Sequence, residues 1–189
     1  MIVLLLSWSL YFFLHSWLAA VGPKNWFRRK FHNVAFRYYR VAYNLFSGAG
    51  LVLLLVFQFR EPSKELFIPS AITTTLGIIL LSAGILIMLM AAMNYDLKSF
   101  FGLIEERKDA LKRGRLNQFV RHPLYSGTTL FFLALCIIWP YYKNLALLII
   151  YVLYIHIGMF YEEKKLVQLY GDDYLQYCSK VKKIIPGIW

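Results

Sequence analysis

The sequence predicts an all-α integral membrane protein with about five transmembrane helices, for three reasons. Its 189 residues are 59% apolar and have a mean hydropathy of +0.53, which are high values for a soluble domain. Several apolar runs are about 20 residues long, the length that a helix needs to cross a bilayer. The basic residues gather in alternate loops, as they do in membrane proteins of fixed orientation.

Five apolar runs define the predicted spans. They cover residues 2–21, 41–59, 70–95, 123–142 and 144–160. The first run lacks the basic start and the cleavage pattern of a secretory signal, so we interpret it as a retained span. The last two runs are so close together that we expect a tight hairpin between them. Residues 161–189 are expected to form a cytoplasmic helical tail, and residues 1–189 a single membrane domain.

A few polar or small residues interrupt the spans. His15 lies in the first run, where a polar side chain either marks a functional site or forms a hydrogen bond between helices, and we favour the hydrogen bond. Gly77 and Gly84 in the third run are interpreted as contacts where helices approach closely. After this run, Asp96 belongs to an aromatic and charged stretch, which we interpret as lying along the lipid headgroups.

The charge distribution predicts the orientation in the membrane. Of the 21 basic residues, all except Arg60, Lys64 and Lys143 lie in residues 22–40, 96–122 and the tail. Basic loops face the cytoplasm, so we expect the N-terminus outside and the C-terminus inside a multi-pass protein of the inner or plasma membrane. The net charge of +11 is explained by this topology, and we expect no nucleic-acid partner.

Two polar clusters lie where spans meet the predicted cytoplasmic side. Arg121, His122, Pro123 and Tyr125 open the fourth span, and Tyr161-Glu162-Glu163 end the fifth. A tight hairpin would bring both clusters to one side of the membrane and form a pocket for an amphiphilic ligand. The alternative is an interfacial anchor, because Arg and Tyr are common at the headgroup level.

The motifs of several other enzyme classes are absent from the sequence. It has no HExxH string, and Cys136 and Cys178 have neither CxxC spacing nor a nearby His, so we expect no metal site. It also has no GxSxG elbow for a serine nucleophile. Adjacent residues on a helix point about 100° apart, so we expect one of Glu162 and Glu163 to face the pocket and the other to face solvent.

The C-terminal half resembles the superfamily of isoprenylcysteine carboxyl methyltransferases and phospholipid methyltransferases, which are integral membrane enzymes. The matching strings are Arg121-His122-Pro123-Leu124-Tyr125-Ser126-Gly127, Glu162-Glu163, Tyr170-Gly171-Asp172-Asp173-Tyr174 with Tyr177, and Ile185-Pro186. Leu14-His15-Ser16 and the stretch 95–102 are similar to a bacterial branch that includes methanethiol S-methyltransferase. The chain departs from the pattern at Val181-Lys182-Lys183, where the superfamily has Val-Pro.

The resemblance implies an enzyme that binds S-adenosylmethionine in a pocket facing the cytoplasm. It assigns cofactor binding to the following residues: His122, Pro123, Tyr125, Gly127, Glu162 and Glu163. It gives catalytic roles to Arg121 and Glu162. A carboxylate would pair with the cofactor's ammonium, Arg121 would meet its carboxylate, and aromatic rings would accept the sulfonium.

The implied reaction is methyl transfer to a small or lipophilic thiol or carboxylate, with membrane lipid around the site. Because the methyl donor is already activated, the protein mainly has to align the acceptor and exclude water. Two alternatives remain open at this point. One is a sterol-type membrane reductase with a similar C-terminal half, and the other is a non-catalytic membrane scaffold or transporter subunit.

Overall fold

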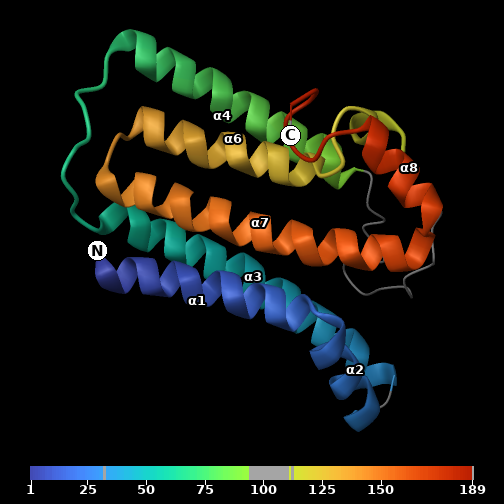
Figure 1. Ribbon diagram of the computed structural model, residues 1–189. Coiled ribbons are helices and arrows are strands. Elements are labelled where there is room, and N and C mark those ends of the chain that lie inside the picture. Colours follow the sequence, from blue (N-terminus) through green and yellow to red (C-terminus); the bar gives the residue numbers. More distant parts are fainter. Residues whose placement is uncertain (32, 94–110, 112, 189) are drawn as a thin grey trace. The chain divides into compact units, whose positions relative to one another are not determined.

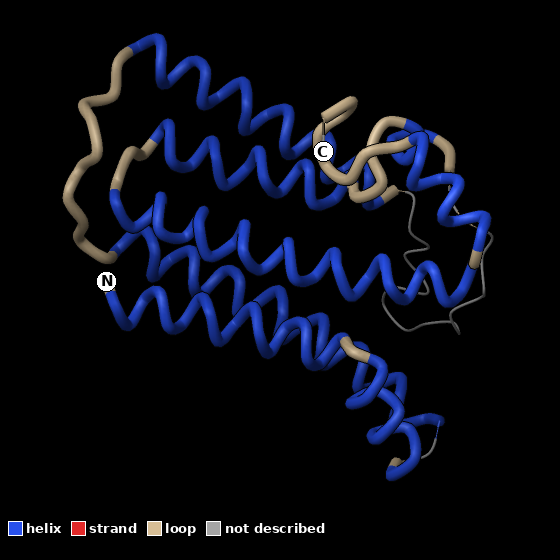
Figure 2. The backbone as a smooth tube through the Cα atoms, viewed as in Figure 1, coloured by secondary structure: helices blue, strands red, loops and turns tan. Residues whose placement is uncertain are grey.

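A computed structural model describes residues 1–31, 33–93, 111 and 113–188. Within these ranges all regular elements are helices, as the tube drawing shows (Figure 2). The all-α fold class is therefore confirmed. The described residues fall into two compact units, the first formed by residues 1–64 and the second by residues 65–93, 111 and 113–188.

The first unit consists of three helices. They are α1 (Ile2–Ala19), α2 (Val21–Lys30) and α3 (Asn33–Arg60). The long helices α1 and α3 lie antiparallel and side by side (Figure 1). Trp8 donates its indole N–H to the Gln58 side chain over 3.0 Å, and both residues are buried. His15 Nδ1 lies 3.1 Å from the Ser47 hydroxyl, which confirms the expected hydrogen bond between helices.

The second unit holds four α-helices and one short 3-10 helix. They are α4 (Ala71–Ala92), η1 (Arg115–Gln118), α6 (Pro123–Ile138), α7 (Tyr142–Tyr170) and α8 (Asp172–Lys180). Ser70 begins α4 with a capping box, in which its side chain accepts from the Thr73 N–H. Helix α6 packs between α4 and α7 (Figure 1).

The hairpin between α6 and α7 is as tight as the sequence predicts. Only residues 139–141 separate the two helices, and Pro140 in this link cannot continue α6. The Asn144 side chain closes the turn by donating to the Trp139 carbonyl over 2.6 Å. The ring centroids of Phe132 and Tyr151 lie 4.5 Å apart and join the two helices further along.

Four described helices are long and apolar enough to cross a membrane. They are Ile2–Ala19, Val41–Arg60, Ala71–Ala92 and Tyr142–Tyr170. The predicted span 123–142 is instead the 16-residue helix α6, which at about 1.5 Å per residue is shorter than the hydrocarbon core. The predicted third span ends at Ala92 in the structure, and Tyr95 and Asp96 lie outside the described residues.

The contact between α4 and α6 depends on two glycines. A Cβ added at Gly84 would lie 2.8 Å from the Gly127 carbonyl oxygen and 3.0 Å from the Phe131 nitrogen. A Cβ at Gly127 would lie 2.8 Å from the Gly84 carbonyl oxygen. The two backbones therefore touch, which confirms that Gly84 is a helix-packing residue.

We expect Gly84→Ala to separate α4 from α6, because the new methyl group would meet backbone atoms that cannot rotate away. The free energy of unfolding should fall by about 1–3 kcal/mol, the usual loss when a methyl group is added to a packed core. Thermal unfolding in detergent would measure this loss. Gly48→Ala is the matched control in α3. None of the residues described comes within 4 Å of a Cβ at Gly48, so this variant should keep or raise stability. Equal unfolding temperatures for the two variants would contradict the close contact.

The end of the chain folds back onto the start of α6. Gly171, at a φ of 54°, turns the chain from α7 into α8, a backbone angle that suits glycine. After α8, residues 181–184 run beside residues 120–122. The Arg121 N–H donates to the Lys182 carbonyl over 2.7 Å, and the His122 N–H donates to the Lys183 carbonyl over 2.9 Å.

Helix α7 continues well beyond the predicted end of the fifth span at residue 160. Residues 161–170, expected to belong to the tail, form its last turns. Tyr161 is followed by a polar section that contains Glu162 and Glu163 but no proline or glycine before Gly171. Both glutamates therefore stand on the continuous helix α7 rather than on a separate helical tail.

Candidate cofactor-binding site

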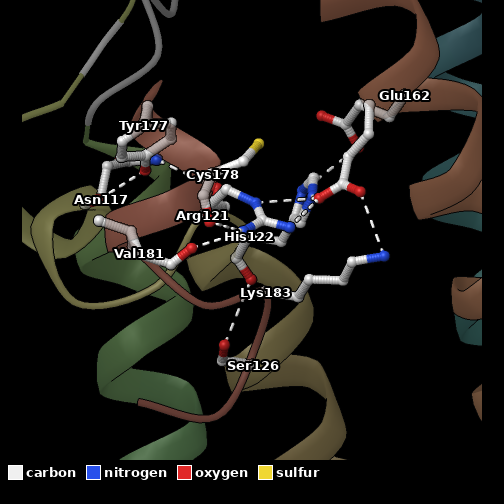
Figure 3. Close-up of polar contacts among 10 residues, drawn as sticks. Asn117, Arg121, His122, Ser126, Glu162, Tyr177, Cys178, Val181 and Lys183 are labelled. Carbon is white, nitrogen blue, oxygen red and sulfur yellow. Dashed lines mark hydrogen bonds and ion pairs between the residues drawn. The ribbon is translucent and has the colours of Figure 1, made fainter. Parts of the chain in front are cut away.

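Three segments of the second unit meet around a group of ionisable side chains. Arg121 and His122 come from the residues before α6, Glu162 and Glu163 from the polar end of α7, and Lys183 from the returning C-terminal segment (Figure 3). We call these five residues the charged cluster. Four of them were predicted from the sequence as site residues, and the structure brings these four together.

Arg121 holds the three segments to one another. Its Nε and Nη2 atoms donate to Glu163 Oε1 over 3.0 and 2.6 Å. Its Nη1 atom donates to the carbonyl oxygens of Cys178 and Val181, as Figure 3 shows. Only 8% of the Arg121 side chain is exposed. Burial by itself would lower the pKa of Arg121, but the hydrogen bond and the charge of Glu163 outweigh it and raise this pKa.

Glu163 is surrounded by hydrogen-bond donors. Its Oε1 atom accepts hydrogen bonds from Arg121 and lies 3.3 Å from His122 Nε2. Its Oε2 atom lies 3.1 Å from Lys183 Nζ. Its side chain is 17% exposed. Both carboxylate oxygens thus have charged or imidazole partners within the protein. Glu163 therefore joins α7 to the segment before α6 and to the C-terminal segment.

Glu162 is in a different position, although it is the next residue. Its side chain is 42% exposed, and its Oε2 atom lies 3.7 Å from His122 Nδ1. Its negative charge also acts on the nearby Tyr125 side chain. The His122 ring lies between the two glutamates, with one nitrogen toward each, and its centroid is 5.5 Å from that of Tyr125. The solvent-exposed side of the charged cluster thus presents the Glu162 carboxylate, with the His122 and Tyr125 rings nearby.

The remaining predicted residues have other surroundings. Pro123 is buried and begins α6, where it fixes the direction of the helix that carries Tyr125 and that His122 precedes. Gly127 lies against Gly84 and Met88 of α4, so the structure does not bring it into the charged cluster. Lys183 was not predicted as a site residue.

Two shallow grooves on the described surface lie outside the charged cluster. One is lined by Thr75 and by apolar residues at the start of α4. The other, of about 250 Å³, is lined by the following residues: Arg113, Gln118, Gln176, Tyr177, Lys180 and Val181. Neither of them contains Glu162. The candidate site is therefore defined by converging polar groups and not by either groove.

Comparison with known proteins identifies a family through the part of the chain that contains most of the charged cluster. The sequence model of a family described as phospholipid methyltransferase matches residues 72–173, which are more than half of the sequence. The chain belongs to the phospholipid methyltransferase family. This confirms the superfamily resemblance, and with the apolar helices it establishes a multi-pass membrane protein. The matched range includes Arg121 to Tyr125 and both glutamates.

One curated relative is methanethiol S-methyltransferase 1 of Bradyrhizobium diazoefficiens. It is 28% identical over 195 residues, an alignment that covers 98% of this chain and 66% of the relative. The chain thus spans slightly less than two thirds of the length of that protein. No solved structure matches the chain.

The side chains at the charged cluster can be compared with the groups of S-adenosylmethionine, the cofactor that the resemblance implies. The exposed carboxylate of Glu162 suits an ammonium group, with which it can form charge-assisted hydrogen bonds. The partly exposed ring of Tyr125 is of the kind that accepts a sulfonium or stacks on adenine, and the His122 ring, only 4% exposed, lies behind it. The donor set of the described residues therefore fits the cofactor that the resemblance implies.

Proposed function

We propose that this protein is a membrane-embedded methyltransferase that uses S-adenosylmethionine and binds its ammonium group through Glu162. The observation that carries the proposal is the difference between the two glutamates. Glu163 is enclosed by Arg121, His122 and Lys183, whereas Glu162 is 42% exposed beside His122 and Tyr125. One carboxylate is occupied by the protein and the other is available to a ligand.

This arrangement changes the role that we propose for Arg121. Its guanidinium already binds Glu163 and two backbone carbonyls, so we assign it to positioning the segments rather than to binding the cofactor's carboxylate. His122 and Tyr125 are proposed to contact the cofactor, while Pro123 orients them through the start of α6. When bound, the cofactor supplies a methyl group that is already activated on sulfur.

The acceptor that we propose is a small or lipophilic thiol or carboxylate that reaches the site from the bilayer. A carboxylate, or a thiol that has first given its proton to water, attacks the methyl carbon without a dedicated base, and the cofactor's sulfur leaves as a neutral thioether. The methyltransferase relative named for methanethiol supports the thiol among these two classes. The protein's part would be to align the acceptor with the sulfonium and exclude water.

Cofactor binding by the detergent-purified protein tests the proposal. We expect S-adenosylmethionine to bind, and a nicotinamide cofactor not to bind. Binding of the nicotinamide cofactor alone would favour the sterol-type reductase, and binding of neither would favour a non-catalytic scaffold or transporter subunit. Radioactive methyl label should then appear in lipid-extractable or volatile products. Label found only in a polar, water-soluble acceptor would contradict the proposed acceptor class.

The orientation proposed for the chain follows from its basic loops, with the N-terminus outside and the C-terminus in the cytoplasm. This places the charged cluster on the side of the membrane where S-adenosylmethionine is made available. Reporter fusions after Glu65 and at the C-terminus measure the orientation. We expect a signal from outside for the first fusion and a cytoplasmic signal for the second. A cytoplasmic signal from the fusion at Glu65 would contradict the five-span topology.

A further inference from the structure

Lys183 contacts the charged cluster from the far end of the chain. Its Nζ atom lies 3.1 Å from Glu163 Oε2, and its side chain is 30% exposed. Its own carbonyl accepts the His122 N–H over 2.9 Å. The preceding residue, Lys182, also accepts a backbone hydrogen bond, from Arg121, but its side chain is exposed. The carbonyls of both lysines thus accept a backbone hydrogen bond from the segment before α6. Of their two side chains, that of Lys183 contacts the charged cluster, whereas that of Lys182 is exposed.

We propose that Lys183 is a positioning residue that fastens the C-terminal segment, residues 181–184, over the site and keeps Glu163 from competing with Glu162 for the cofactor. This inference rests on the proposed function, because it concerns the same site. It adds a residue outside the range that the family model matches, which ends at residue 173.

The geometry around Glu163 gives the reason. Arg121 and His122 both approach Oε1, and among the described residues the ion pair recorded at Oε2 is the one with Lys183. Without the Lys183 ammonium, Oε2 would offer a free acceptor close to Glu162. A ligand ammonium could then be drawn to the wrong carboxylate. Lys183 therefore separates the roles of two adjacent glutamates.

The same contact holds the C-terminal segment in place. Apart from Lys183, this segment is tied to the start of α6 by the two backbone hydrogen bonds and by the Ser126 hydroxyl, which donates to the Ile184 carbonyl over 2.7 Å. The Val181 carbonyl accepts from Arg121 on the other side. Losing the Lys183 side chain removes the segment's ion pair with α7. The backbone bonds of Arg121 and His122 should then open more often.

The experiment compares Lys183→Met with Lys182→Met, which removes the same charge one residue away. Hydrogen exchange at the amides of Arg121 and His122 reports on the segment without any ligand, and titration of S-adenosylmethionine into the folded fraction reports on the site. For a partly exposed ion pair we expect Lys183→Met to speed exchange and weaken cofactor binding by about 3- to 10-fold each. Lys182→Met should change neither.

Two further variants test whether Lys183 acts through Glu163. Lys183→Arg keeps the charge and should restore both measurements toward those of the parent protein. In a Glu163→Gln background, adding Lys183→Met should weaken cofactor binding little further, because residues that act together have non-additive effects. Additive losses would overturn the proposed route through Glu163.

The outcomes separate this inference from the proposed function. If the parent binds the cofactor and the two lysine variants behave alike, the role of Lys183 is overturned while the proposed function stands. Faster exchange with unchanged affinity would make Lys183 merely structural and would also overturn it. If the parent binds no S-adenosylmethionine, the proposed function fails and the positioning role fails with it. Exchange would then still decide whether Lys183 fastens the segment.

Discussion

Glu162→Gln is expected to weaken binding of S-adenosylmethionine by roughly 10- to 100-fold. The variant keeps the shape of the side chain but removes its negative charge, and with it a charge-assisted hydrogen bond of about 1.5–3 kcal/mol to the cofactor's ammonium. Because Glu162 is 42% exposed and Arg121 is bound to Glu163, this change should leave the protein's stability nearly unaltered. Calorimetric titration of the purified protein would measure the affinity.

Asp172→Asn provides the control for the loss of one negative charge. Asp172 is exposed at the start of α8 and belongs to the same unit, but it is not part of the charged cluster. Its substitution should leave cofactor affinity unchanged. If Glu162→Gln binds the cofactor as tightly as Asp172→Asn does, the ammonium is bound elsewhere and the proposed site is wrong.

Arg121→Met is expected to have the largest effect on stability. It would leave Glu163, 17% exposed, with less compensation for its charge, and it would release the carbonyls of Cys178 and Val181. Breaking a buried ion pair on one side costs about 3–5 kcal/mol, and we expect the lower end because Lys183 still contacts Glu163. Denaturant or thermal unfolding in detergent would measure the loss.

Two companion variants make this prediction more specific. Arg121→Lys should recover only part of the stability, because one ammonium cannot reproduce the planar set of donors that reaches Glu163 and two carbonyls at once. Arg121→Met combined with Glu163→Gln should be more stable than Arg121→Met alone, because no unpaired charge then remains. A double variant as unstable as the sum of its two single changes would contradict the pairing.

Much of the fold could be predicted from the sequence because bilayers impose a simple length and composition on helices. The hairpin, the interhelical bond of His15 and the close contact at Gly84 all follow from local patterns. The helix ends were less predictable. Helix α7 passes residue 160 because nothing there stops a helix, and polarity alone does not end one. Helix α6 stops early because Pro140 interrupts it.

The site was predictable as a group of residues but not in its division of roles. The hairpin brings Arg121 and His122 close to the glutamates. This was predictable because the two apolar runs that form the hairpin have similar lengths, so their outer ends lie on the same side. The direction in which each glutamate points depends on the rotation of α7, which adjacent identical residues do not reveal. Lys183 was missed because its contact requires the chain to turn at Gly171 and return. No local pattern in Val181-Lys182-Lys183 indicates such a return.

The position of Glu162 just beyond the apolar part of α7 also bears on how rates should be measured. With the proposed site at this border, the cofactor would arrive from water and leave as a polar product, while a lipophilic acceptor would arrive and leave within the bilayer. Turnover would then depend on the acceptor's mole fraction in the lipid rather than on its bulk concentration. Diluting the acceptor with inert lipid at constant total amount should slow the reaction, whereas adding buffer that contains the same saturating concentration of cofactor should not.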